Sequence, residues 1–120
     1  GLMADSDAAS DSPVVRASSG RGLDSDKGVR IEDLSTAGSN LEPLLFTFQP
    51  GCGSDGALSH EGEESLLVMA GRLNLQLDGS VDYVLEVGDS MAFRSERPHA
   101  WINPGDVPTT VLWINTPRTF

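Results

Sequence analysis

Three side chains stand out as candidate metal ligands: His60, Glu64 and His99. His60 and Glu64 are four positions apart in the segment SHEGEE at 59–64. In an extended strand, side chains two or four positions apart point to the same side, so we expect these two to share a face. Two imidazoles and one carboxylate form a facial ligand set that suits Fe(II), Zn, Ni or Mn and leaves positions open for water or a ligand.

The third ligand comes from the segment RPHAWIN at 97–103. By the same spacing, His99, Trp101 and Asn103 share one face of a second strand. If the two strands meet across a barrel interior, His99 joins His60 and Glu64. The alternative is that the histidines are satisfied polar residues and that Glu64 belongs to a solvated charge cluster. The spacing alone leaves both interpretations open.

The elements that must position these residues are short strands. From Leu41 onwards, apolar runs recur at intervals that glycine and proline interrupt. These runs lie at 44–48, 64–70, 72–77, 82–87, 90–94, 99–103 and 110–115. Strands at every ~8–12 residues are typical of an antiparallel β sandwich or a small barrel. No amphipathic pattern predicts a substantial helix, and Asp78-Gly79 predicts a hairpin turn because both residues tolerate positive φ.

The chain divides into three predicted parts. Residues 1–12 are small and acidic and are predicted to be a disordered segment. Residues 13–40 contain two short candidate strands, at 14–17 and 28–33, with a loop between them, and we expect them to pack on the barrel. Residues 41–120 form the barrel itself.

Composition limits the classes of function. The 120 residues include 18 acidic and 8 basic ones, for a net charge of −10, which disfavours direct binding to nucleic acid or anionic lipid. No apolar run approaches the ~18 residues of a membrane-spanning helix, so we expect a cytoplasmic protein without a membrane partner. The one cysteine, Cys52, excludes an intramolecular disulfide and a multi-thiolate zinc site.

The stretch from Gly51 to Asn103 resembles the two motifs of the cupin superfamily. In the first motif, His60, Glu64 and Gly71 match the second histidine, the glutamate and the closing glycine. The first histidine of that motif is replaced by Leu58, so one of the usual four ligands is missing. The resemblance implies an all-β fold, a small antiparallel double-stranded β-helix also called a cupin or jelly-roll barrel.

In the second motif, Gly88, His99 and Asn103 match the glycine, the histidine and the asparagine. Arg94 and Glu96 replace the proline and the glycine of that motif. The resemblance implies that His60, Glu64 and His99 are the ligands of a divalent metal.

Residues 41–117 are more closely similar to the C-terminal cupin domains of bacterial helix-turn-helix regulators of the XRE type. In such proteins a DNA-binding domain precedes the cupin, so we expect a fragment of a longer regulator that contacts DNA only through that missing domain. Exposed sheet edges favour a homodimer. The ligand pattern is also similar to that of hydroxypropylphosphonate epoxidase, an iron enzyme.

Three functions therefore remain open. The first is a small-molecule sensor domain of a transcriptional regulator, with or without a metal. The second is a metal-dependent oxygenase, epoxidase or isomerase that uses His60, Glu64 and His99. The third is a metal-free, non-catalytic barrel. The predicted ligand-binding residues are Leu58, Met91, Phe93, Trp101 and Asn103.

Overall fold

Nine β-strands and no helix make up the described part of the chain, which in this computed structural model comprises residues 12–17, 22–25 and 27–119. The strands are β1 (Gly22–Asp24), β2 (Val29–Asp33), β3 (Glu42–Phe48), β4 (Glu63–Ala70), β5 (Leu73–Leu77), β6 (Val81–Leu85), β7 (Ser90–Arg94), β8 (His99–Ile102) and β9 (Thr109–Thr116). The acidic segment predicted at 1–12 lies outside the described residues except for Ser12.

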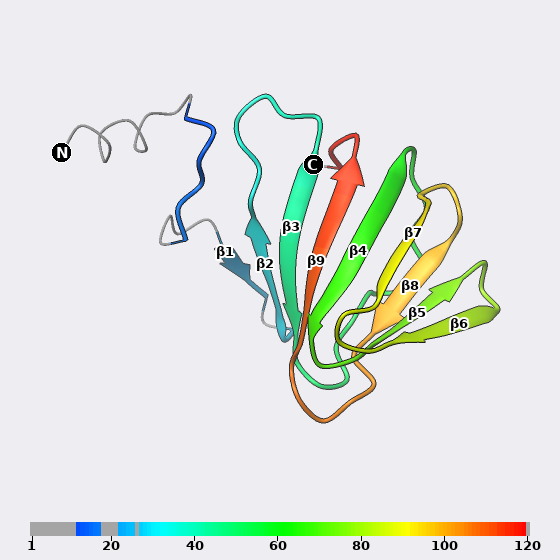
Figure 1. The fold of residues 1–120 in the computed structure, drawn as a ribbon. Helices are drawn as coiled ribbons and strands as arrows, with labels where there is room; N and C mark the ends of the chain where they lie inside the picture. The colour runs from blue at the N-terminus through cyan, green and yellow to red at the C-terminus, as the bar shows by residue number, and fades with distance from the viewer. Residues whose placement is uncertain (1–11, 18–21, 26, 120) are drawn as a thin grey trace.

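The strands form two antiparallel sheets (Figure 1). The larger sheet has six strands in the order β1-β2-β3-β9-β4-β7, and the smaller has three in the order β6-β5-β8. The chain passes from β4 in the large sheet to β5 and β6 in the small one, returns to β7, and crosses again to β8. The antiparallel β architecture predicted from the strand pattern and the jelly-roll fold implied by the resemblance are both confirmed.

The hydrophobic core lies between the two sheets. Leu73, Leu75 and Leu77 alternate along β5 and are at most 2% exposed. They face Leu66 and Trp113 of the large sheet within one core cluster. Full burial of a leucine side chain contributes about 1.5–3 kcal/mol to folding, so this alternation is a main source of the free energy that holds the sheets together.

Two predictions about the N-terminal part were wrong. Residues 14–17 form no strand, and β1 instead lies in the stretch predicted as a loop. Strand propensity at 14–17 is not enough, because within the described residues no neighbouring strand pairs with this segment. The three residues of β1 are ordered by pairing with β2, where Asp24 Oδ1 accepts a hydrogen bond from Arg30 Nη1 at 2.9 Å.

Two turns set the register around the core. Asp78 and Gly79 both have positive φ, at 58° and 73°, which confirms the hairpin predicted between β5 and β6. Gly71, with φ of 75°, connects β4 to β5. A Cβ atom on Gly71 would lie 2.5 Å from the Pro108 carbonyl oxygen. The closing position of the first motif is therefore glycine because a side chain there would collide with the backbone.

Candidate metal centre

Two of the three candidate ligands lie on strands that face each other across the core. Glu64 of β4 lies opposite Phe93 of β7 and Asn115 of β9, and His99 of β8 lies opposite Leu77 of β5. Directly opposed residues of antiparallel strands point to the same side of their sheet. Since Phe93 and Leu77 belong to the core, Glu64 and His99 also point into the space between the sheets.

His60 reaches the site from a loop and not, as predicted, from the strand that carries Glu64. β4 begins only at Glu63, and Gly62, with φ of 115°, interrupts extended backbone between the two ligands. Backbone hydrogen bonds hold the loop in place: His60 N donates to Ser95 O at 3.0 Å, and Ser95 N donates to Gly62 O at 2.8 Å. The loop that carries His60 is thereby tied to the loop that leads into His99.

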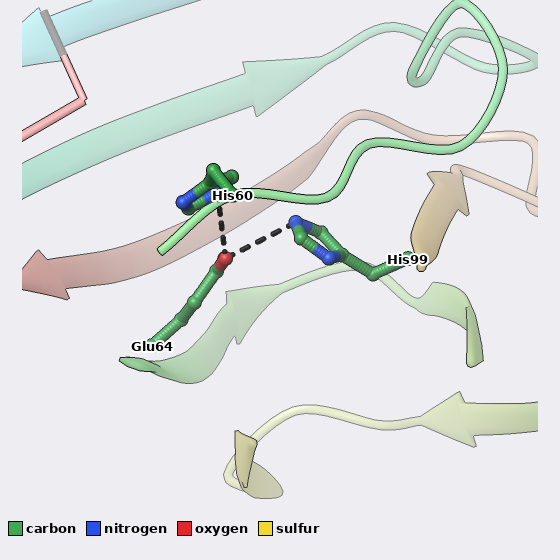
Figure 2. Close-up of side chains that lie close together, drawn as sticks. All are labelled: His60, Glu64 and His99. Carbon is green, nitrogen blue, oxygen red and sulfur yellow. Dashed lines mark ion pairs between the residues drawn. The ribbon is translucent and has the colours of Figure 1, made fainter. Parts of the chain in front are cut away.

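Both histidines approach the same oxygen of Glu64 (Figure 2). Nε2 of His60 lies 3.0 Å and Nε2 of His99 lies 3.1 Å from Glu64 Oε2. The other carboxylate oxygen, Oε1, accepts a hydrogen bond from Trp113 Nε1 at 2.7 Å. The buried Oε2 itself forms no hydrogen bond of good geometry. The Glu64 carboxylate is therefore oriented by Trp113, with Oε2 directed between two imidazoles.

Backbone carbonyls determine which ring nitrogen of each histidine carries hydrogen. Nδ1 of His99 donates to Arg97 O at 2.8 Å, and Nδ1 of His60 donates to Glu61 O at 3.2 Å. A carbonyl oxygen only accepts, so these partners assign the hydrogen to Nδ1 in both rings. Nε2 of each ring is then the nitrogen directed at the Glu64 carboxylate. A protonated ring donates Nε2–H to the carboxylate, whereas a neutral ring offers its Nε2 lone pair to a cation placed between the groups. Metal-binding histidines show this arrangement, with the second nitrogen bonded to a carbonyl.

The electrostatics of the cluster favour a bound positive charge. Burial disfavours ionisation of Glu64, but the His99 imidazole and the Trp113 indole N–H outweigh burial and hold the pKa of the carboxyl below its ordinary value. Burial also opposes protonation of His99, but the Glu64 carboxylate and the Arg97 carbonyl outweigh it and raise the pKa of the imidazole. The pocket is thus built around an anionic carboxylate that attracts a cation.

The three side chains have the donor atoms and the spacing of a metal site. Their ligand atoms all lie within 4.8 Å of one another, and Glu64 and His99 are at most 4% exposed. Two ligands at right angles on an ion, each about 2.1 Å away, are about 3.0 Å apart, which matches both carboxylate–imidazole distances. The residues present therefore fit a divalent ion. Leu58 takes the place of a fourth ligand, so such an ion would keep open positions.

An apolar cavity of about 260 Å³ adjoins the three ligands. Its aromatic wall consists of Phe46, Trp101 and Trp113, with ring centroids 5.6 Å apart for Phe46 and Trp113 and 4.7 Å for the two tryptophans. No lysine or arginine is among the described residues that line it. The lining of the cavity combines an aromatic wall with a carboxylate and two imidazoles.

The predicted ligand-binding residues do not all reach this cavity. Leu58 and Trp101 line it. Phe93 does not line it but packs behind the site, with its ring centroid 5.1 Å from that of His99. Met91 of β7 lies opposite Leu66 of β4. It packs against the hydrophobic core and does not line the cavity.

Asn103, the fifth predicted ligand-binding residue, is not brought to the cavity. It is fully buried, and its Nδ2 donates to Phe48 O at 3.0 Å and to Val107 O at 2.8 Å, while Oδ1 accepts from Gly105 N at 2.9 Å. β8 ends at Ile102, so the alternation that puts His99 and Trp101 on one face stops before Asn103. Its side chain holds loops together instead of facing a ligand.

Several residues around the cavity were not singled out from the sequence. Phe46, Trp113, Asn115 and Thr119 line it, and the buried Glu42 lies beside Asn115. Strand alternation predicts that Trp113 and Asn115 share a face, so this signal was available for β9. Only the pairing of β9 between β3 and β4 shows that this face is the one that carries Glu64.

The two-sheet barrel, with a His/Glu cluster in its interior, defines a class of small β-barrels with a ligand cavity. Residues 44–115 match the Cupin_2 family, described as "Cupin domain", and the chain belongs to this family.

Relatives include transcriptional regulators, as the resemblance implied. The chain is 34% identical over 80 residues to the HTH-type transcriptional regulator PuuR of Escherichia coli (strain K12), a match that covers 67% of this chain and 43% of that protein. The chain thus spans less than half the length of this curated relative.

Solved structures with the same fold include an RmlC-like cupin from Shewanella frigidimarina NCIMB 400, with a TM-score of 0.76 and 20% identity over 88% of this chain and 91% of that one. The Cupin_2 domain of an XRE family transcriptional regulator from Enterobacter cloacae has a TM-score of 0.67 and 22% identity, over 76% of this chain and 99% of that one. A sugar phosphate isomerase of the cupin superfamily from Silicibacter pomeroyi DSS-3 has a TM-score of 0.66 and 28% identity. That match covers 76% of this chain and 60% of the isomerase chain.

Across the described residues there is no helix with the length and apolar character needed to cross a membrane.

Proposed function

We propose that this chain is the small-molecule-sensing cupin domain of a cytoplasmic transcriptional regulator and that it holds a divalent metal at His60, Glu64 and His99. The observation that carries the proposal is the convergence of these three side chains in the wall of an apolar cavity. The similarity to PuuR and to the regulator domain from Enterobacter cloacae supports the regulatory role.

The cavity supplies the recognition chemistry of this proposal. A bound divalent ion would offer its open positions to an oxygen or nitrogen atom of the small molecule. Trp101, Trp113 and Phe46 provide apolar and aromatic surface for the rest of the molecule. Trp113 also keeps the Glu64 carboxylate oriented through its indole N–H.

The response to the ligand would pass to a DNA-binding domain elsewhere in the regulator. With a net charge of −10, the chain itself is unsuited to contact a phosphate backbone. A ligand that binds one arrangement of the barrel more tightly than another shifts the equilibrium of the attached DNA-binding domains. Two domains attached to one cupin dimer would match a two-fold symmetric operator.

A homodimer is part of the proposal and has a candidate surface on the outer face of the large sheet. Leu45, Leu112 and Leu67 lie opposite one another across β3, β9 and β4, and Leu67 is 37% exposed. Covering such a row with a second copy removes apolar surface from water. We expect light scattering to give twice the mass of the 12.7 kDa chain. A monomer mass at micromolar concentration would contradict this part of the proposal.

The test of the sensor proposal is elemental analysis of protein purified without chelators, together with the coding sequence upstream of Gly1. We expect one equivalent of a divalent transition metal per chain and an upstream helix-turn-helix domain. If the protein is metal-free and also fails to bind added Zn²⁺, the metal site is refuted and the metal-free, non-catalytic barrel becomes the better description. A natural start codon at this point would remove the regulatory role.

The open coordination positions favour an enzyme as the second candidate function. Leu58 lines the cavity but has no donor atom, so an ion held by three residues would keep coordination positions free for a substrate. One solved relative is described as a sugar phosphate isomerase. Turnover by the metal-loaded protein, with Fe(II) and oxygen or with sugar phosphates, would replace the sensor proposal by an oxygenase or isomerase.

A further inference from the structure

The segment after β9 reaches the cavity and forms part of its wall. β9 ends at Thr116, and the residues 117–119 that follow it are here called the closing segment. Thr119 lines the cavity together with His60, Glu64 and His99. A residue of this segment therefore lies against the same space as the three candidate metal ligands.

One fastening of the closing segment is a buried carboxylate on β3. The backbone N and the hydroxyl of Thr119 both donate to Glu42 Oε1, at 3.3 and 2.6 Å. Asn115 Nδ2, from β9, donates to the same oxygen at 3.2 Å. Glu42 is fully buried, and its other oxygen, Oε2, has no hydrogen-bond partner among the described residues. All three of these hydrogen bonds end on Oε1, and two of the three donors belong to Thr119 of the closing segment.

A second fastening joins the closing segment to the loop after β2. Arg118 Nη1 donates to Ser35 Oγ at 2.5 Å, and Arg118 Nη2 lies 3.2 Å from Asp33 Oδ2. The side chains of Arg118 and Asp33 are 32% and 26% exposed. Water therefore competes for this pair, and such a pair opens at low cost.

The start of the closing segment also presses on the loop between two of the ligands. Gly62 lies between His60 and Glu64 in the chain, and a Cβ atom there would lie 2.8 Å from Pro117 Cδ. Backbone and proline ring thus meet with no room for a side chain. The loop that carries His60 is therefore packed against the end of β9 and the start of the closing segment.

From these three contacts we infer that the closing segment is a gate, whose release from Asp33, Ser35 and Glu42 opens the cavity for exchange of its contents. The closing segment is held by polar contacts to the part-exposed Asp33, to Ser35 and to Glu42, whose Oε2 has no partner among the described residues. The aromatic wall of the cavity instead packs within or against the hydrophobic core. A segment held by polar contacts is expected to open at lower cost than this packed aromatic wall. The inference rests on the proposed function for the identity of the metal, but not for the opening itself.

Zn²⁺ alone serves as the probe, and tryptophan fluorescence reports on the cavity because both tryptophans of the chain, Trp101 and Trp113, line it. Association is followed by stopped flow and release by excess chelator. Acrylamide quenching measures access to the cavity independently of metal. The variants are Arg118→Ala and Asp33→Asn, each with a thermal melt to check folding. The control is Arg72→Ala, which removes an exposed ion pair with Glu86 away from the cavity.

We expect Arg118→Ala and Asp33→Asn to raise the association and dissociation rates of Zn²⁺ by the same factor, roughly threefold to tenfold, with Kd unchanged. Acrylamide quenching rises in parallel, and Arg72→Ala behaves as the parent chain. Unchanged rates and unchanged quenching would overturn the gate. Faster dissociation together with a higher Kd would also overturn it, because that result means that the closing segment only stabilises the metal ligands. If the parent chain binds no Zn²⁺, the metal proposal fails and quenching alone decides the gate.

Discussion

Replacing Glu64 by glutamine is expected to lower the affinity for Zn²⁺ by about 100-fold or more. The substitution keeps the shape of the side chain and leaves a carbonyl oxygen to accept the Trp113 N–H. It removes the one negative charge that faces both imidazoles, at 3.0 and 3.1 Å. Two neutral nitrogens and an amide hold a divalent ion far less well than a set with a carboxylate. Even the loss of a group that only hydrogen-bonds to a metal ligand lowers metal affinity by about 10- to 100-fold, so we expect the loss of the ligand charge itself to cost at least as much. Isothermal titration with Zn²⁺ measures the change.

The adjacent glutamate provides a matched control for this experiment. Glu63 precedes Glu64 on β4 and is exposed, on the opposite side of the sheet. Glu63→Gln makes the same change in net charge and is expected to leave the Zn²⁺ affinity within about twofold, because an exposed charge is screened. Equal losses in the two variants would mean that the acidic surface attracts the ion nonspecifically, and full retention by Glu64→Gln would refute the ligand assignment.

Asn103→Ala is expected to lower the free energy of unfolding by about 2–4 kcal/mol, because it removes three hydrogen bonds in a fully buried place. The carbonyls of Phe48 and Val107 lose that donor. Those bonds tie the end of β3 to the loop between β8 and β9, so the loss affects the crossing between the two sheets. Chemical denaturation followed by circular dichroism measures the effect.

The second expectation for Asn103→Ala concerns the site. At a temperature where the variant is folded, its Zn²⁺ affinity should equal that of the parent chain, because Asn103 does not line the cavity. Asn74→Ala is the control for stability: Asn74 Oδ1 has no hydrogen-bond partner among the described residues, so its removal should cost less than about 1 kcal/mol. A stable Asn103→Ala variant with impaired Zn²⁺ binding would show that the asparagine acts at the site after all.

His60 meets Glu64 for a reason different from the one that the sequence pattern suggests. Strand periodicity places the two side chains on one face, and they do lie close together, but β4 begins only at Glu63. The convergence comes from a loop that bends at Gly62 and is bonded to Ser95. Local spacing describes neighbours within one strand, whereas this loop is held by groups that lie far away in the sequence.

The cavity wall also combines a local pattern that the sequence shows with a strand order that only the fold shows. Alternation along β9 is visible in the sequence and pairs Trp113 with Asn115 on one face. That this face meets Glu42 on one side and Glu64 on the other depends on the insertion of β9 between β3 and β4. The order of strands within a sheet is set by contacts between distant segments, so the alternation of one strand does not contain it.

Asn103 shows that a matching motif position does not define what the side chain does. It fits the second cupin motif by its spacing from His99. In the folded chain its side chain bonds to Phe48 O, Val107 O and Gly105 N and does not face the cavity. These partners include a residue of β3 far away in the sequence, which no spacing within the motif indicates.

The strand pattern from Leu41 onwards, the turn at Asp78-Gly79 and the identity of the candidate ligands could be predicted from the sequence alone. Alternation, turn chemistry and ligand type are properties of single residues and of their near neighbours in the chain. The folded structure was needed to show that His60 approaches Glu64 from a loop, that Asn103 bonds to the end of β3 and that Thr119 bonds to Glu42. Each of these depends on contacts between distant segments, whose free energy comes from burial and hydrogen bonding that no local pattern contains.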